Sequence, residues 1–293
     1  MRSVTLRAYA KINLSLDVTG KREDGYHLLR SVFQGISLYD DVQVIRDNGT
    51  PGITITCNLS YIPTDERNIV HKVATAFFRA AEIADYSVAI DLNKTIPSGA
   101  GLGGGSADGA AVFSALCRLY EVPFTTEQAT AILTPLGADI PFFLHSGTML
   151  AEGIGEILSP LPPLKDCYIV IAKPKAGANT KQIYETLAQV GIPAHPDTEN
   201  VIKALETGDL ALLGRSTGNV LEYATIPLCP PVQTLKDAFK AEQALVTLMS
   251  GSGSSVFGIF ETEKAARKAM RTLQKETRTL FLTRPVCRPM KTN

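Results

Sequence analysis

The sequence contains no tryptophan, and its five cysteines are scattered, with no two of them in a Cys-x-x-Cys pair. This spacing argues against a zinc site, and the odd number of cysteines argues against a disulfide framework. The four histidines also lack the spacing of metal ligands. We therefore expect reduced, mostly buried thiols in a cytoplasmic protein.

The chain also lacks an excess of charge and any long apolar run. Lysine plus arginine and aspartate plus glutamate number 29 each. No basic tract interleaves with aromatic residues, so a nucleic-acid surface is not expected. No run of 18 apolar residues occurs, which predicts no membrane span, and residues 1–10 lack the apolar core of a signal peptide. The 293 residues, 45% of them hydrophobic, are enough for two domains.

The strongest turn signal, Ser-Pro-Leu-Pro-Pro at residues 159–163, predicts a boundary between two domains, residues 1–160 and 161–293. Before it, the pattern predicts one long strand or two at 3–19 and further strands at 28–38, 41–46, 53–58 and 87–91. Helices are expected at 70–84, 110–120 and 126–137. After it, strands are expected at 167–172, 245–248, 255–260 and 279–283, and helices at 180–190, 198–207, 232–241 and 263–276. The second half therefore predicts helices on an antiparallel sheet, an α+β pattern.

The most informative segment is Pro-Ser-Gly-Ala-Gly-Leu-Gly-Gly-Gly-Ser-Ala at residues 97–107. Glycine allows positive φ and close approach of backbone to a ligand. A helix that follows directly offers free N–H groups and the positive end of its dipole. We expect a phosphate cradle, because a flexible linker would not lie so tightly between a strand and a helix. A Walker A loop would need a lysine after the glycines, and a dinucleotide-binding unit would need a second parallel strand.

Three other segments place polar residues among apolar ones. Lys11 and Asn13 share one face of a strand, and Lys11 is either a surface lysine on an edge strand or a lysine aimed into a site. Asp139 precedes Ile-Pro-Phe-Phe, which suits an N-cap and also a proton-accepting carboxylate. Residues 249–256, Met-Ser-Gly-Ser-Gly-Ser-Ser-Val, form either a bare β-turn or a loop that closes over phosphates.

The order of these segments resembles the GHMP small-molecule kinases. The resemblance extends from residue 8 to about residue 261 and is carried by residues 10–14, 25–27, 101–106, 137–141, 151–156 and 250–253. It implies a two-domain fold: an N-terminal α/β domain similar to ribosomal protein S5 domain 2 and a ferredoxin-like C-terminal domain, with the site between them. The triple glycine before Ser106 points to members that phosphorylate the 2-hydroxyl of a cytidine diphosphate-linked methylerythritol, in the non-mevalonate route to isoprenoid precursors.

The resemblance also implies roles for single residues. Asp139 would accept the hydroxyl proton, while Lys11 would orient the hydroxyl and offset charge on the transferred group. ATP and Mg²⁺ would be the cofactors, with no metal ligand assigned. The ATP-binding residues would be Asn68 and Lys94 near the adenosine, and Pro97, Ser98, Gly99, Ala100, Gly101, Leu102, Gly103, Gly104, Gly105, Ser106 and Ala107 around the phosphates. The substrate-binding residues would be Asn13, Tyr26, His27, Asp139, Thr180 and Tyr184, with both tyrosines stacking on cytosine.

Two positions depart from the family pattern: Ala107 stands where a second serine is frequent, and Gly109 where alanine is frequent. The resemblance implies a monomer or homodimer with a small-molecule substrate and no nucleic-acid partner. Two alternatives stay open. One is another GHMP enzyme, such as homoserine kinase or a mevalonate-pathway kinase. The other is a non-catalytic ligand-binding protein on the same scaffold, which the presence of both Lys11 and Asp139 disfavours.

Overall fold

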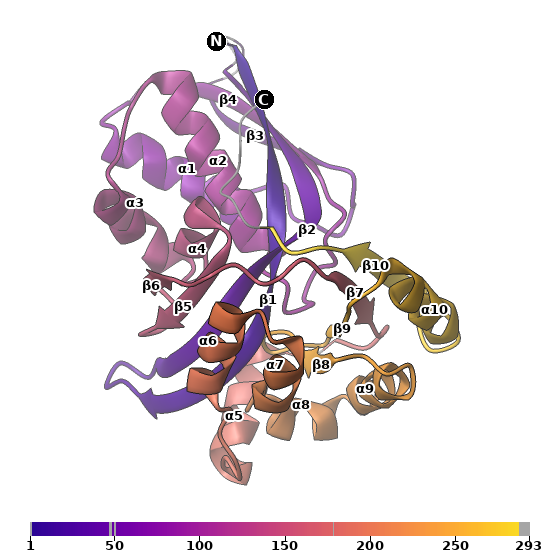
Figure 1. Cartoon of the computed structure of the whole chain (residues 1–293). Helices are drawn as coiled ribbons and strands as arrows, with labels where there is room; N and C mark the ends of the chain where they lie inside the picture. The colour runs from indigo at the N-terminus through magenta and orange to yellow at the C-terminus, as the bar shows by residue number, and fades with distance from the viewer. Residues whose placement is uncertain (1, 47–48, 50, 178, 287–293) are drawn as a thin grey trace.

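The computed structural model describes residues 2–46, 49, 51–177 and 179–286. A six-stranded sheet is built from the first half of the chain and a four-stranded antiparallel sheet from the second. Figure 1 shows helices α1–α4 beside the first sheet and helices α5–α10 around the second. The α+β architecture expected from the sequence is confirmed.

The first sheet is organised around a long hairpin. Its strands are β1 (Ser3–Lys21), β2 (His27–Arg46), β3 (Gly52–Cys57), β4 (Ser87–Asn93), β5 (Thr148–Glu152) and β6 (Ile157–Pro160). β2 pairs with β1 along its length, with β4 through its second half and with β5 through its first half. The expectation of two separate strands at 28–38 and 41–46 was wrong, because the backbone stays extended across the polar residues 39–41.

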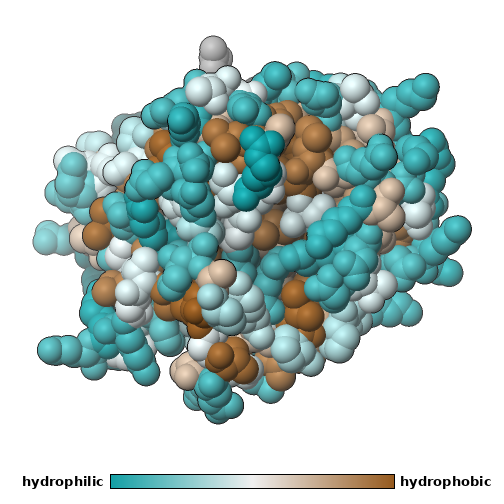
Figure 2. All heavy atoms as spheres, turned by 60° about the horizontal axis from the view of Figure 1, so that its bottom comes forward, coloured by the Kyte–Doolittle hydropathy of each residue, from teal (hydrophilic) through white to brown (hydrophobic). Residues whose placement is uncertain are grey.

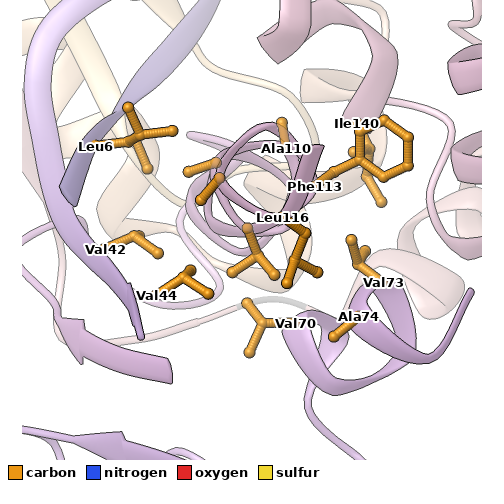
Figure 3. Close-up of a cluster of buried hydrophobic side chains, with 14 of the residues drawn as sticks. Leu6, Val42, Val44, Val70, Val73, Ala74, Ala110, Phe113, Leu116 and Ile140 are labelled. Carbon is orange, nitrogen blue, oxygen red and sulfur yellow. The ribbon is translucent and has the colours of Figure 1, made fainter. Parts of the chain in front are cut away.

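The helices of the first half are α1 (Ile69–Ala80), α2 (Gly104–Tyr120), α3 (Thr126–Leu133), the 3₁₀ turn Thr134–Leu136 and α4 (Ile140–His145). α2 lies between the sheet and α1, and Figure 3 shows Phe113 and Leu116 of α2 with Val42 and Val44 of β2 and Val73 of α1 in one buried cluster. α2 begins six residues earlier than expected, at Gly104 rather than at residue 110. The end of the predicted glycine loop is therefore the first helical turn.

The strands of the second sheet are β7 (Tyr168–Lys173), β8 (Val246–Met249), β9 (Val256–Phe260) and β10 (Thr279–Thr283). They lie in the order β10-β7-β9-β8, the 4-1-3-2 order of a ferredoxin-like sheet. The helices are α5 (Thr180–Val190), α6 (Thr198–Thr207), α7 (Leu210–Ser216), α8 (Glu222–Leu228), α9 (Pro231–Ala241) and α10 (Glu263–Leu273). The sequence did not predict α4, α7, α8, β5 or β6. The three helices have six or seven residues, about two turns, which gives little helical periodicity.

The two sheets share a buried core, which brings the two halves of the chain together. Ile12 and Leu14 of β1 and Leu102 of the glycine-rich segment are in one apolar cluster with Ile171 of β7 and Phe257 of β9. Burial of these apolar side chains against one another favours one fixed arrangement of the halves. The glycine-rich segment therefore lies at the junction of the sheets.

On the face seen in Figure 2, hydrophobic residues form separate patches among hydrophilic ones. In the described ranges, no helix has the length and apolar character needed to cross a membrane. Cys167 and Cys229 are buried and Cys57 and Cys117 are half-buried, in partial agreement with the expectation of mostly buried thiols. Cys287 lies outside the described residues.

Candidate active site

A cavity of about 420 Å³ follows the glycine-rich segment, whose residues 97–106 line it almost continuously. Gly99, Gly101 and Gly103 have φ values of +59°, +74° and +71°, which side-chain-bearing residues rarely adopt. Gly103 is the N-cap of α2, so no cap side chain accepts from the first-turn N–H groups. These donors and the positive end of the helix dipole favour an anion such as phosphate.

The turn between β8 and β9, residues 250–255, closes one side of this cavity. The Ser250 hydroxyl donates to the Gly101 carbonyl over 2.9 Å, and Ser252 and Gly253 line the cavity. The Ser252 hydroxyl is also 2.9 Å from the Thr180 hydroxyl at the start of α5. Elements of both halves of the chain therefore form the cavity, and the second glycine-rich loop is more than a bare turn.

Lys94 lies in the cavity wall between two carboxylates. Its ammonium group is paired with Asp40 on β2 and Asp108 on α2, and all three side chains are buried. Burial opposes the charge of Lys94, but the two carboxylates outweigh burial and raise its pKa. Burial also raises the pKa of Asp108, to about 7, and Asp108 Oδ1 has no hydrogen-bond partner. Lys94 is thus a fixed positive charge beside the glycine backbone.

Asn68 caps α1 rather than lining the cavity. Its Oδ1 accepts from the Val70 N–H over 3.1 Å, and its Nδ2 donates to the Pro63 carbonyl over 2.6 Å. Its neighbour Ile69 does line the cavity. Asn68 therefore affects the cavity indirectly, because it fixes the position of Ile69 and the start of α1.

Lys11 and Asp139 form an ion pair, with 3.6 Å between Lys11 Nζ and Asp139 Oδ2. Lys11 is 4% exposed, and its ammonium donates to Asn13 Oδ1 over 2.7 Å and lies 4.6 Å from the centre of the Phe33 ring. Burial lowers the pKa of Lys11, and Asp139 partly offsets this effect. The surface-lysine interpretation is therefore excluded.

Asp139 occupies the N-cap position of α4, but its side chain makes no capping hydrogen bond. Its carboxylate is about one-third exposed, whereas Lys11 is almost fully enclosed. The pair can thus reach a ligand through Asp139 while its positive member stays shielded from water. Such a carboxylate is placed to accept a proton from a bound hydroxyl.

The pair adjoins the phosphate-type cavity. The backbone N–H of Lys11 donates to the Leu102 carbonyl over 3.0 Å. A Cβ atom on Gly103 would lie 3.3 Å from Lys11 Cγ and 2.5 Å from Phe143 Cζ. The glycine-rich backbone therefore packs directly on the lysine stem, which only a residue without a side chain permits.

A second cavity, of about 830 Å³, is lined by Tyr26, His27 and Tyr184 together with Ala138, the neighbour of Asp139 in the chain. Burial raises the pKa of Tyr184, and the charge of Asp139 adds to the rise. The His27 ring stacks on Tyr184 with centroids 4.5 Å apart. Burial and the charge of Lys21 lower the pKa of His27, which favours the neutral ring at pH 7.

The structure thus sorts the expected site residues into three groups. Lys94, Thr180 and the glycine-rich segment surround the first cavity, Lys11 and Asp139 form the ion pair beside it, and Tyr26, His27 and Tyr184 line the second cavity. Ala107 is buried in α2, and Asn13 is fully buried below Lys11. The sequence analysis missed Asp40 and Asp108. Asp108 lies one helical turn after Gly104, which could have indicated a position near the phosphate-type cavity. The sequence does not show whether Asp40 or Asp41 faces Lys94, because this depends on how β2 pairs with its neighbours.

Comparison with known proteins agrees with this arrangement. The family model "GHMP kinases N terminal domain" matches residues 68–147, and "GHMP kinases C terminal" matches residues 201–278. The chain is 42% identical to a 4-diphosphocytidyl-2-C-methyl-D-erythritol kinase of Lachnoclostridium phytofermentans, over 92% of each chain. It is 40% identical to the protein of that name in Clostridium novyi, over 96% of this chain and 99% of the relative.

Solved structures show the same similarity. A crystal structure of 4-(cytidine 5'-diphospho)-2C-methyl-D-erythritol kinase superposes with a TM-score of 0.79 and 32% identity, over 96% of this chain and 98% of the other. A homoserine kinase from Cytophaga hutchinsonii superposes with a TM-score of 0.78 at 20% identity, over 100% and 98% of the two chains. At that identity the second likeness shows a shared fold.

Proposed function

This chain belongs to the 4-diphosphocytidyl-2-C-methyl-D-erythritol kinases of the GHMP kinase family, and on that premise we propose the reaction that it catalyses. The γ-phosphoryl group of ATP is transferred to the 2-hydroxyl of 4-diphosphocytidyl-2-C-methyl-D-erythritol, a step in the methylerythritol phosphate pathway of isoprenoid biosynthesis. One observation supports this most directly. The Lys11–Asp139 pair adjoins both a glycine-lined cavity and a cavity lined by aromatic rings.

The glycine-lined cavity suits the triphosphate of ATP. Positive φ at three glycines and the uncapped start of α2 present backbone N–H groups, whereas the charge of Lys94 in the cavity wall is already paired with Asp40 and Asp108. The described residues include no group of three or more His, Cys, Asp or Glu side chains that could hold a metal. Mg²⁺ would therefore be held mainly by the phosphates, with the hydroxyls of Ser98 and Ser106 in the cavity wall as protein ligands. Bound there, Mg²⁺ would neutralise phosphate charge.

The pair then handles the proton and the charge. Asp139 accepts the proton of the 2-hydroxyl, because its carboxylate is about one-third exposed and makes no capping bond that would compete. Lys11 directs that carboxylate and stabilises negative charge on the transferred group from an enclosed position, where a charge acts strongly. Phosphoryl transfer depends mainly on such positioning and charge stabilisation.

The aromatic cavity would hold the cytidine. Tyr26 is 58% exposed, with the Arg22 guanidinium 5.7 Å from its ring centre, while one face of Tyr184 is covered by His27. A cytosine that stacks on Tyr184 must displace the His27 ring or use the opposite face. A neutral His27 carries one donor and one acceptor, which can read the hydrogen-bonding edge of a base. Thr180, in the wall of the phosphate-type cavity, would contact the substrate from that side.

We assign residues 1–160 and 161–293 to the two domains of the enzyme and expect a cytoplasmic monomer or homodimer with no nucleic-acid partner. Assays of ADP release with the cytidyl substrate, homoserine and mevalonate test the activity. We expect turnover with the cytidyl substrate and at most traces with the others, with an Asp139→Asn variant as the control for contaminating kinases. Equal turnover of homoserine would contradict the proposal.

A further inference from the structure

Asn13 is fully buried, and a single oxygen of its side chain joins two parts of the site. Its Oδ1 accepts from Lys11 Nζ over 2.7 Å and from the backbone N–H of Gly251 over 2.9 Å. Its Nδ2 donates to the Ser31 hydroxyl over 2.9 Å. Both lone pairs of the oxygen are thus used, one by the lysine of the ion pair and one by the second glycine-rich loop.

The backbone around Asn13 is shaped for this arrangement. The register of the β1–β2 pair shifts between Tyr9 and Lys11 and again between Asn13 and Ser15. Such irregularities re-aim side chains and are frequent next to active sites. Between the two shifts, Lys11 and Asn13 point to the same side, toward the loop and toward Asp139.

The second glycine-rich loop is held by both halves of the chain: Ser250 and Ser255 donate to the carbonyls of Gly101 and Ala100, and Asn219 holds it from its own half. The Asn219 amide donates to the carbonyls of Met249 and Gly251 over 2.9 and 2.8 Å. Ser252 and Gly253 of the same loop line the phosphate-type cavity. A displacement of this loop at the cavity therefore moves the Gly251 N–H, which is hydrogen-bonded to Asn13 Oδ1, the same atom that accepts from Lys11.

We propose that Asn13 is a positioning residue that couples the placement of the loop at residues 250–255 to the orientation of Lys11. The proposal rests on the kinase function proposed above and differs from a role of Asn13 as a contact to the substrate. When the loop lies against the nucleotide phosphates, Gly251 and Asn13 hold Lys11 beside Asp139. When the loop moves away, the ammonium loses the acceptor that directs it.

This coupling predicts opposite effects for two substitutions. Asn13→Ala removes the acceptor from a buried ammonium, so the Lys11 pKa should fall further and the alkaline limb of kcat should move to lower pH. Loss of a hydrogen bond to a charged group should lower kcat about 10- to 100-fold, with the KM of the cytidyl substrate within about two-fold of wild type. Asn13→Asp keeps the acceptor and adds a negative charge, so the limb should move to higher pH.

The experiment measures kcat and both KM values from pH 6 to 10 for wild type, Asn13→Ala, Asn13→Asp and Ser31→Ala. Ser31→Ala is the matched control, because it removes the partner of Nδ2 and leaves both bonds of Oδ1, so its alkaline limb should stay in place. A large rise in the KM of the cytidyl substrate with an unmoved limb would show a substrate contact and overturn the proposal. If Asn13→Ala does not fold, the test rests on Asn13→Asp: its alkaline limb of kcat should lie at higher pH than that of wild type, and an unmoved limb would overturn the proposal.

A measurement without turnover separates this inference from the function. The Lys11 pKa can be followed by NMR of the ¹⁵N-labelled ammonium in the nucleotide-free protein and with an ATP analogue bound. We expect the nucleotide to raise the Lys11 pKa in wild type more than in Asn13→Ala. If wild type does not phosphorylate the cytidyl substrate, the proposed function fails, while equal pKa responses in the two proteins would refute the coupling.

Discussion

Replacement of Gly101 by alanine should loosen the contact between the two glycine-rich loops. Gly101 has a φ of +74°, and a Cβ atom there would lie 1.9 Å from the carbonyl oxygen of Ser250. That neighbour is backbone and cannot rotate away. The loop at residues 250–255 must therefore move as a unit, away from the cavity that it closes.

The expected cost has two parts. Positive φ costs an alanine about 1–2 kcal/mol. Displacement of the loop breaks three hydrogen bonds: Ser250 Oγ to the Gly101 carbonyl, Gly251 N–H to Asn13 and Ser255 N–H to the Ala100 carbonyl. At about 0.5–1.5 kcal/mol each, their loss brings the total to about 3–6 kcal/mol. In a chain of this size, the Tm should fall by about 6–12 °C.

Gly99→Ala is the matched control, because Gly99 has a φ of +59° in the same segment but no atom within 4 Å of the position of a Cβ. Gly99→Ala should introduce only the backbone strain of positive φ, which should lower the Tm by about 2–4 °C. The difference in Tm between the two variants, measured without nucleotide, gives the effect of the close contact between the new Cβ atom and the Ser250 carbonyl. The KM for ATP should rise more in Gly101→Ala than in Gly99→Ala. Equal Tm values for the two variants would refute the reasoning, because the close contact with Ser250 would then carry no energy.

The ion pair and the aromatic cavity lead to three further predictions. Asp139→Asn should keep ATP binding and lower kcat by about 10²–10⁴; more than a third of wild-type kcat would argue against a general base. Lys11→Met should lose comparable activity without a lower Tm at pH 7, because it removes a buried charge. The pKa of Lys11 in the folded protein lies below its ordinary value of 10.5. Between the folded-state pKa and 10.5 the unfolded chain binds more protons, so the free energy of unfolding of wild type should rise with pH while kcat falls as Lys11 deprotonates. The free energy of unfolding of Lys11→Met should not rise in this range, and the same pH dependence in both proteins would contradict the prediction. Tyr184→Ala should raise the KM of the cytidyl substrate about 10- to 100-fold without making the enzyme accept a uridyl analogue. His27→Ala should reduce the ratio of kcat/KM for the cytidyl substrate to kcat/KM for the uridyl analogue. Measurement of kcat/KM with both substrates checks both predictions.

Much of the fold followed from local patterns in the sequence. Strands and helices of ten or more residues show enough periods for detection, as α1 with its Asn68 cap and the amphipathic α10 demonstrate. The glycine-rich segment was also legible, because positive φ at Gly99, Gly101 and Gly103 is a demand that glycine meets best. Short elements such as α7 escaped detection because a helix of two turns has little periodicity of its own.

The order of residues along the chain was enough to recognise the side chains for phosphate binding and proton transfer, and the motif order indicated the family. Tertiary structure alone decided how those residues meet: that Asp40 and Asp108 enclose Lys94, that Gly251 reaches Asn13, and that Thr180 lies at the phosphate-type cavity. These contacts join segments far apart in the chain, and the docking of two sheets on a shared core sets their distances. Local propensity carries no information about such docking, because it depends on how the apolar faces of the whole chain pack together.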